Sequence, residues 1–182
     1  MAARLLIKSG HHQVAFVAGS HDTSTSLERE RGFREELQKH GLEPYIEMGK
    51  FSYQGAFDAA RRLMKLPKSP DAVFCANDIM AIGVLDALHH AELKKVPEEV
   101  SVIGFDDIPM AAWPSYNLTT IRQPIERMID SAVNDLLDRI KHDIMTPKQE
   151  LFAGDLVVRS SARLPSGLSS GWVISTSETR NV

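Results

Sequence analysis

Short apolar runs alternate with longer mixed segments along the first two thirds of the chain. The short runs are rich in Val, Ile, Phe and Ala and end in polar or turn-forming residues, as buried strands do. The longer segments have the length and apolar content of helices. This alternation predicts an α/β fold with an open, mostly parallel sheet flanked by helices. The predicted strands cover 13–18, 45–48, 72–76 and 100–105, and the predicted helices cover 1–9, 27–40, 54–65 and 78–90.

The alternation breaks down after residue 107. Residues 108–117 form a loop with two prolines, and a short strand is predicted at 118–121. Pro124 then begins a helix that reaches about residue 141. Its apolar side chains recur at three- and four-residue spacing, so this helix needs a surface to cover. The apolar stripe comprises Ile125, Met128, Ile129, Val133, Leu136, Leu137 and Ile140.

Composition narrows the class of protein. The chain has 182 residues, of which 43% are hydrophobic, enough to bury a core. Its formal net charge is −3 and its Lys and Arg residues are scattered, which argues against a surface that binds nucleic acid. No apolar run approaches the roughly 20 residues that cross a bilayer, and the first ten residues lack a secretory signal. We therefore expect a cytoplasmic protein with no membrane partner.

The sequence offers no usual handle for catalysis or for a metal. P-loop, G-x-S-x-G, H-E-x-x-H and dinucleotide-binding motifs are absent. The pairs His11-His12 and His89-His90 lack the spacing of metal ligands. The single cysteine, Cys75, lies inside a predicted strand and is expected to be a small core residue. We therefore expect a protein that is not an enzyme and uses no cofactor.

Polar residues directly follow two of the predicted strands. Asn77 and Asp78 come after the third strand, and Asp106 and Asp107 come after the fourth. Strand ends of open α/β sheets are where such folds hold ligands. A carboxylate there accepts two hydroxyl hydrogen bonds from one sugar or nucleoside-like ligand, which makes Asp106 the first candidate. Two alternatives remain open: Asn77 caps the following helix, or the Asp pair caps the following loop.

Six segments between about residues 2 and 161 carry a recognisable set of motifs. They are GHHQVAFVAG at 10–19, RERGF at 29–33, FCANDIMAIG at 74–83, VPEEVSVIGFDD at 96–107, LTTIRQP at 118–124 and LVVRSS at 156–161. In this order they resemble the LacI/GalR family of bacterial transcription regulators. The resemblance is to the effector-binding domain, whose fold is shared with periplasmic sugar-binding proteins.

The resemblance implies a division of the chain. Residues 1–117 would form the C-terminal subdomain of a type I periplasmic-binding-protein-like domain. Residues 118–148 would be a crossover strand and helix belonging to the N-terminal subdomain, 149–161 a last strand that returns, and 162–182 a tail. Family members begin with a helix-turn-helix DNA-binding head, so we expect this chain to be truncated at its N-terminus. Alone, it should bind no effector with useful affinity and no specific DNA.

The resemblance also implies which residues contact the effector. Asp106 matches a position that contacts effectors, Asn77 one that touches sugar in some members, and Phe51 the place of a ring that stacks on the effector. Thr23 stands where some relatives keep an arginine, and loss of that anion clamp favours a neutral sugar-like polyol. Arg29 is expected to brace the loop ends. The remaining candidates are Thr25, Gln123 and Trp113.

The predicted helix at 78–90 is apolar on nearly all sides. One side would cover the sheet, and the family uses this region for dimerisation, so we expect the other side to bind a second copy. A wholly buried helix is the alternative. The expected dimer residues are Met80, Ala81, Val84, Leu85 and Leu88.

Together these inferences favour a non-catalytic sensor. In it, a sugar-like effector shifts how a dimeric regulator presents its DNA-binding heads to operator DNA. A transport-type sugar-binding protein of the same fold is the alternative, opposed by the missing signal peptide and the LVVRSS ending. A small α/β enzyme that uses Asp106 or Asp107 as an acid or base is the third hypothesis, and it lacks a third catalytic group.

Overall fold

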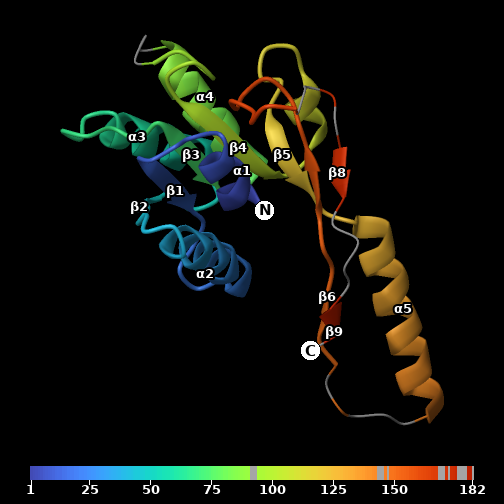
Figure 1. Cartoon of the computed structure of the whole chain (residues 1–182). Helices are drawn as coiled ribbons and strands as arrows, with labels where there is room; N and C mark the ends of the chain where they lie inside the picture. The colour runs from blue at the N-terminus through green and yellow to red at the C-terminus, as the bar shows by residue number, and fades with distance from the viewer. Residues whose placement is uncertain are drawn as a thin grey trace.

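A seven-stranded sheet forms the centre of the protein (Figure 1). The structure is a computed structural model and describes residues 1–90, 94–142, 146, 148–167, 171, 173–175 and 180–181. The strands are β1 (Val14–Ala18), β2 (Tyr45–Met48), β3 (Ala72–Cys75), β4 (Ser101–Asp106), β5 (Thr119–Arg122), β7 (Asp155–Val157) and β8 (Val173–Ser175). Their order is β2-β1-β3-β4-β5-β7-β8; the first five are parallel, and β7 pairs antiparallel with β5 and β8. The expected α/β fold with a mostly parallel sheet is confirmed.

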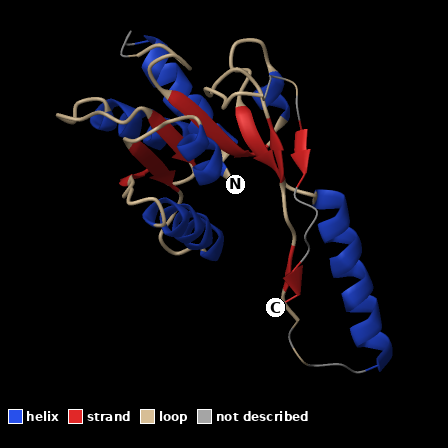
Figure 2. Ribbon diagram, viewed as in Figure 1, coloured by secondary structure: helices blue, strands red, loops and turns tan. Residues whose placement is uncertain are grey.

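Helices cover both faces of this sheet (Figure 2). The helices are α1 (Ala2–Lys8), α2 (Ser24–Gln38), α3 (Tyr53–Leu63), α4 (Asp78–His90), the 3-10 helix η1 (Pro109–Ala112) and α5 (Ile125–His142). The chain runs outward from β1 to β2 through α2, and then back past β1 to β3 through α3. Because crossovers between parallel strands are right-handed, this reversal puts α2 and α3 on opposite faces. Helix α1 packs on α2, and α4 packs on α3.

Three aromatic rings fill the core beneath α2. The ring centroids of Phe16, Phe33 and Phe74 lie 5.0 to 5.8 Å apart, and all three side chains are buried. Cys75, the next residue of β3, is also buried, and this burial raises the pKa of its thiol. Cys75 therefore has the core position expected from the sequence, as a protonated and unreactive thiol.

The structure contradicts the expected dimer face of α4. Each of the five side chains proposed for it is at most 1% exposed in the single chain, so none is available to a second copy. Helix α3 packs against α4 and also contacts β1 and β2, and it buries the side chains of Ala56, Ala59, Ala60 and Leu63. The wholly buried helix, kept as the alternative, is what forms. The five residues are Met80, Ala81, Val84, Leu85 and Leu88.

Helix α5 projects away from the body of the protein (Figure 1). None of its residues is buried, although its apolar stripe has the predicted spacing. Ile140 is 72% exposed and Leu136 is 58% exposed. The surface that this stripe needs is therefore not supplied by the described part of the chain. Within that same part, no helix is both long enough and apolar enough to cross a membrane.

The residues after α5 differ from the prediction. Two short strands, β6 (Glu150–Leu151) and β7, take the place of the single strand expected across 149–161. Strand β6 pairs with β9 (Arg180–Asn181) outside the main sheet, and β8 lies in the segment expected to be a tail. Strands of two or three residues carry too little hydrophobic pattern to be found from sequence.

Candidate functional site

The carboxyl ends of five parallel strands meet at one edge of the sheet. The strand order reverses between β1 and β3, because the chain goes to β2 first and then returns. In open α/β sheets, ligands bind outside the carboxyl ends of the strands at such a reversal. Most of the predicted site residues follow these ends, including Thr23 after β1, Asn77 after β3 and Gln123 after β5.

Asp106 stands at the centre of this edge, as the last residue of β4. Gln123 Nε2 donates a hydrogen bond of 2.6 Å to Asp106 Oδ1, and Arg29 Nη2 lies 3.7 Å from the same oxygen. Burial raises the pKa of Asp106, while Arg29 and the hydrogen bond from Gln123 oppose that rise. An open hollow of about 520 Å³ lies beside the pair. The lining residues are Asp106, Asp107, Arg122, Gln123, Pro124, Ile125, Glu126 and Arg127.

Arg29 reaches from α2 across two strand ends. Its Nη1 donates a hydrogen bond of 2.5 Å to the carbonyl oxygen of Ala76, just after β3. Its guanidinium carbon lies 3.8 Å from the centre of the Phe105 ring in β4. Burial lowers the pKa of Arg29, and the carboxylates of Asp106 and Asp78 oppose this effect. Arg29 thus links α2, β3 and β4, and it also presents a cation beside Asp106.

Asn77 serves the helix that follows it. Its Oδ1 accepts a hydrogen bond of 2.9 Å from Met80 N, which is the geometry of an N-cap. The side chain is half-buried at the end of β3. This bond engages Oδ1, so a ligand at the strand edge would chiefly meet the Nδ2 amino group.

Phe51 lies over the end of β1. Lys50 and Phe51 both have positive φ angles, 55° and 54°, which turn the loop after β2 back toward the sheet. The ring rests on the backbone of Gly19, where a Cβ atom would lie 2.1 Å from Phe51 Cζ. Gly19 is therefore the residue that lets the ring approach β1. Phe51 is half-buried and packs against the core, so part of the residue stays accessible to solvent.

The other candidates divide between the edge and a distant loop. Thr23 Oγ1 donates a hydrogen bond of 3.0 Å to the carbonyl oxygen of Ser20 in the loop after β1, and Thr25 is exposed in the first turn of α2. Trp113 is 53% exposed and follows η1. Its carbonyl oxygen accepts from Asn117 N, just before β5 begins, so the structure does not bring Trp113 to the edge that holds Asp106.

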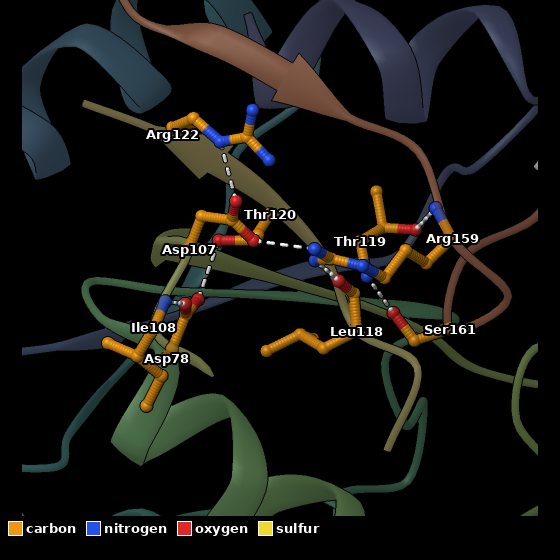
Figure 3. Close-up of polar contacts among 9 residues, drawn as sticks. All are labelled: Asp78, Asp107, Ile108, Leu118, Thr119, Thr120, Arg122, Arg159 and Ser161. Atoms are coloured by element: carbon orange, nitrogen blue, oxygen red, sulfur yellow. Dashed lines mark hydrogen bonds and ion pairs between the residues drawn. The ribbon is translucent and has the colours of Figure 1, made fainter. Parts of the chain in front are cut away.

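Sequence reasoning missed an ion-pair network behind the edge (Figure 3). Asp107 Oδ2 accepts from Arg122 Nε at 2.6 Å, and Asp107 Oδ1 accepts from Arg159 Nη2 at 2.7 Å. Arg159 Nη1 also donates to the carbonyl oxygen of Leu118 at 2.7 Å. The sequence suggested a loop cap or an acid–base role for Asp107, and it did not suggest these ion pairs, because Arg122 and Arg159 lie 15 and 52 residues away. The sequence feature that could have pointed to this network was Arg159, the arginine of the LVVRSS motif.

The described residues contain no group of three or more His, Cys, Asp or Glu side chains that could hold a metal ion. The chemistry of the edge is that of hydrogen bonding, with a carboxylate, an amide and a guanidinium close together. Such a set suits a ligand with several hydroxyl groups.

Comparisons with known proteins agree with this description. The profile of a family described as a periplasmic binding protein-like domain matches residues 3–162. The ribose operon repressor of Escherichia coli (strain K12) is 37% identical over 165 residues, which are 89% of this chain and 50% of that repressor. The chain therefore spans about half the length of the curated relatives it matches.

Solved structures give the same picture. A transcriptional regulator CelR-cellobiose complex matches with a TM-score of 0.81 and 34% identity, covering 88% of this chain and 49% of that one. A dimeric Lac repressor with an 11-residue C-terminal deletion matches with a TM-score of 0.82 and 26% identity, covering 91% and 60%. These similar proteins are transcriptional regulators and not enzymes, as expected from the missing catalytic motifs.

Proposed function

We propose that this chain forms one wall of an effector site. The chain belongs to the periplasmic-binding-protein-like domain family, and its relatives are LacI-type transcriptional regulators. The observation that carries this proposal is Asp106. Its carboxylate is held at the carboxyl edge of the sheet by Gln123 and Arg29, beside an open hollow. A carboxylate fixed in this way is ready to accept hydrogen bonds from a small ligand.

The effector we propose is a sugar or a related polyol. Neighbouring hydroxyl groups match the acceptor of Asp106 and the amides of Gln123 and Asn77. The ring of Phe51 offers an apolar surface for the C–H face of a sugar. Thr23 supplies no positive charge, which makes an anionic effector a poorer match. The names of two relatives point the same way, a ribose operon repressor and a regulator solved with cellobiose.

The effector would act through populations of conformations. An effector that binds between two walls favours the closed arrangement of those walls. If the closed and open forms hold the DNA-binding heads differently, effector binding changes the affinity of the regulator for operator DNA. In this proposal the chain contributes the sensing wall, which includes β5, and α5 extends toward the second wall. DNA is bound by a helix-turn-helix head in the cytoplasm. The exposed stripe of α5 is then the surface that packs against that second wall.

We also propose a homodimer, on a surface other than the buried face of α4. Tyr53 OH and Tyr116 OH both donate to Asp86 Oδ2, at 2.8 and 3.4 Å, so α3, α4 and the loop before β5 meet at one aromatic surface. Tyr53 is 39% exposed and Trp113 is 53% exposed. Exposed aromatic side chains of this kind are enriched at protein interfaces. Sedimentation should give a dimer for the wild type and a monomer for Trp113→Glu, and a wild-type monomer at high concentration would rule the dimer out.

A thermal-shift screen tests the proposed function. Ribose, cellobiose and other neutral sugars, at concentrations high enough to reveal weak binding by this one wall, should raise the melting temperature further as their concentration increases, because a ligand that binds only the folded state stabilises it. Purines and sugar acids at the same concentrations serve as the matched comparison. Stabilisation by purines with none by any neutral sugar would overturn the proposed effector class.

A further inference from the structure

Two consecutive residues at the site have unfavourable backbone angles. Asp106 has a φ of 119° and Asp107 a φ of 57°, in the region that favours glycine. A non-glycine residue with such angles is strained and persists only where its surroundings hold it. The conformation of Asp106, and with it the direction of its carboxylate, therefore depends on contacts around this turn.

Asp78 makes the contact on the far side of the turn (Figure 3). Its Oδ2 accepts a hydrogen bond of 2.9 Å from Ile108 N, the amide that follows the two strained residues. Its Oδ1 accepts a hydrogen bond of 2.6 Å from Thr120 Oγ1 in β5. The Asp78 side chain is fully buried, and Gly104 makes room for it, because a Cβ atom at residue 104 would lie 2.1 Å from Oδ1.

These bonds distinguish Asp78 from an ordinary helix cap. The cap of α4 is already supplied by Asn77, whose Oδ1 accepts from Met80 N. The carboxylate of Asp78 points to the β4 loop and to β5 instead. Burial raises the pKa of Asp78, and the two hydrogen bonds oppose that rise. Burying a carboxylate removes it from water and is energetically unfavourable unless the group is hydrogen-bonded. The bonds from Ile108 N and Thr120 Oγ1 offset this desolvation.

We propose that Asp78 is a positioning residue for the effector site, which fixes the Asp106-Asp107 turn by anchoring Ile108 N to β5 through Thr120. Asp107 is anchored from the other side by Arg122 and Arg159. The two residues that follow Asp106 are thus both tied, Asp107 through its side chain and Ile108 through its amide, and Asp106 directs its carboxylate to Gln123 and Arg29. The role of Asp106 toward a sugar rests on the proposed function, whereas the anchoring itself does not.

Variants of Thr120 test the anchor without removing the buried carboxylate. Thr120→Val keeps the shape and deletes the hydroxyl that holds Asp78 Oδ1, and Thr120→Ser restores the hydroxyl. The matched control is Ser101→Ala, at the start of β4 and equally buried, which removes an acceptor from Arg163 N and leaves Asp78, Asp107 and Arg159 untouched. If Thr120→Val fails to fold, Thr120→Ser and Thr120→Ala are compared in its place.

The decisive readout is the backbone of Asp106 in the whole chain, followed by NMR. The three-bond HN–Hα coupling of Asp106 distinguishes a φ near 119° from extended backbone. We expect this coupling to change in Thr120→Val and to keep its wild-type value in Thr120→Ser and Ser101→Ala, although Thr120→Val and Ser101→Ala both lose stability. An unchanged Asp106 coupling in folded Thr120→Val, or an equal change in Ser101→Ala, would overturn the proposal.

A ribose titration of the same samples tests the proposed function separately. If Asp106 contacts the sugar, Thr120→Val should weaken ribose binding about tenfold, the effect of misplacing one hydrogen bond to a charged group. Unchanged ribose binding together with a changed Asp106 coupling would keep Asp78 as the anchor of the turn and remove Asp106 from the effector site.

Discussion

Gln123 Nε2 lies 2.6 Å from Asp106 Oδ1, although 17 residues separate the two in the sequence. The pairing follows from the register of the sheet, in which Asp106 of β4 stands opposite Arg122 of β5. Arg29 approaches the same oxygen. In the described part of the chain, both partners of the Asp106 carboxylate therefore use Oδ1, which leaves Oδ2 for a ligand hydroxyl.

Replacing Asp106 should weaken sugar binding and leave the fold intact. Asp106→Ala is expected to cost about 1.5–3 kcal/mol of binding free energy, the range for hydrogen bonds to a charged group. Calorimetric or NMR titration with ribose measures this loss. Asp58→Ala, on the exposed surface of α3, is the control and should bind as the wild type does. Wild-type affinity in Asp106→Ala would exclude Asp106 from the site.

The contact between Gly19 and Phe51 should appear as coupling between two substitutions. Gly19→Ala forces the ring of Phe51 to move and is expected to cost about 1–3 kcal/mol of stability, as overpacking does. Gly19 does not have a positive φ, so the ring is the chief obstacle. In a Phe51→Ala background the same substitution should cost little. Urea unfolding of the four proteins measures the coupling, and additive losses would show that the ring does not rest on Gly19.

Glu36 should make stability depend on pH at acid values. Hydrogen bonds from Arg4 in α1, and then from Lys39, lower the pKa of Glu36 to about 2. Because the folded pKa is the lower one, this stabilisation is present above the ordinary value of 4.5 and is lost as the pH falls through about 2. The side chain is near the surface, so solvent screening keeps the effect small.

Urea unfolding at several acid pH values tests this assignment. Glu36→Gln should flatten the pH dependence of the unfolding free energy in that window. Glu35→Gln is the comparison, because the ion pair of Glu35 is made with Arg31 on the same helix and does not join α1 to α2. Equal flattening in both variants would show that the Arg4–Glu36 pair does not hold the helices together.

Two leucine substitutions should separate the buried helix from the exposed one. Leu85→Ala in α4 is expected to cost about 2–5 kcal/mol, because Leu85 is 1% exposed. Leu136→Ala in α5 should change stability by no more than about 0.5 kcal/mol, since Leu136 is 58% exposed. Thermal unfolding measures both. Equal losses would mean that the stripe of α5 is covered in solution.

The strand ends were predictable from sequence, whereas the contacts between them were not. Asp106 and Asn77 were found because an apolar run stops at each of them. The hydrogen bond from Gln123 to Asp106 depends on the register of β4 and β5, which no local pattern specifies. Likewise, Asp107 and Arg159 meet across three strands, so the sequence marked both residues and did not pair them.

The error at α4 has a physical cause. Its all-round apolar surface correctly indicated two covering surfaces, and the sequence does not say which element supplies the second. The small side chains of α3, such as Ala56 and Ala60, let that helix lie against α4. A charged residue at Leu85 should therefore disrupt the fold and not release a folded monomer.

The most direct test of the central claim is an NMR titration of the whole chain with ribose, up to concentrations that reveal weak binding. We predict that the largest amide shift changes fall at Asp106, Gln123, Asn77 and Phe51, and that Asp106→Ala abolishes them. Saturating shift changes confined to other residues, or the same changes persisting in Asp106→Ala, would contradict a sugar site at the carboxyl edge of the sheet.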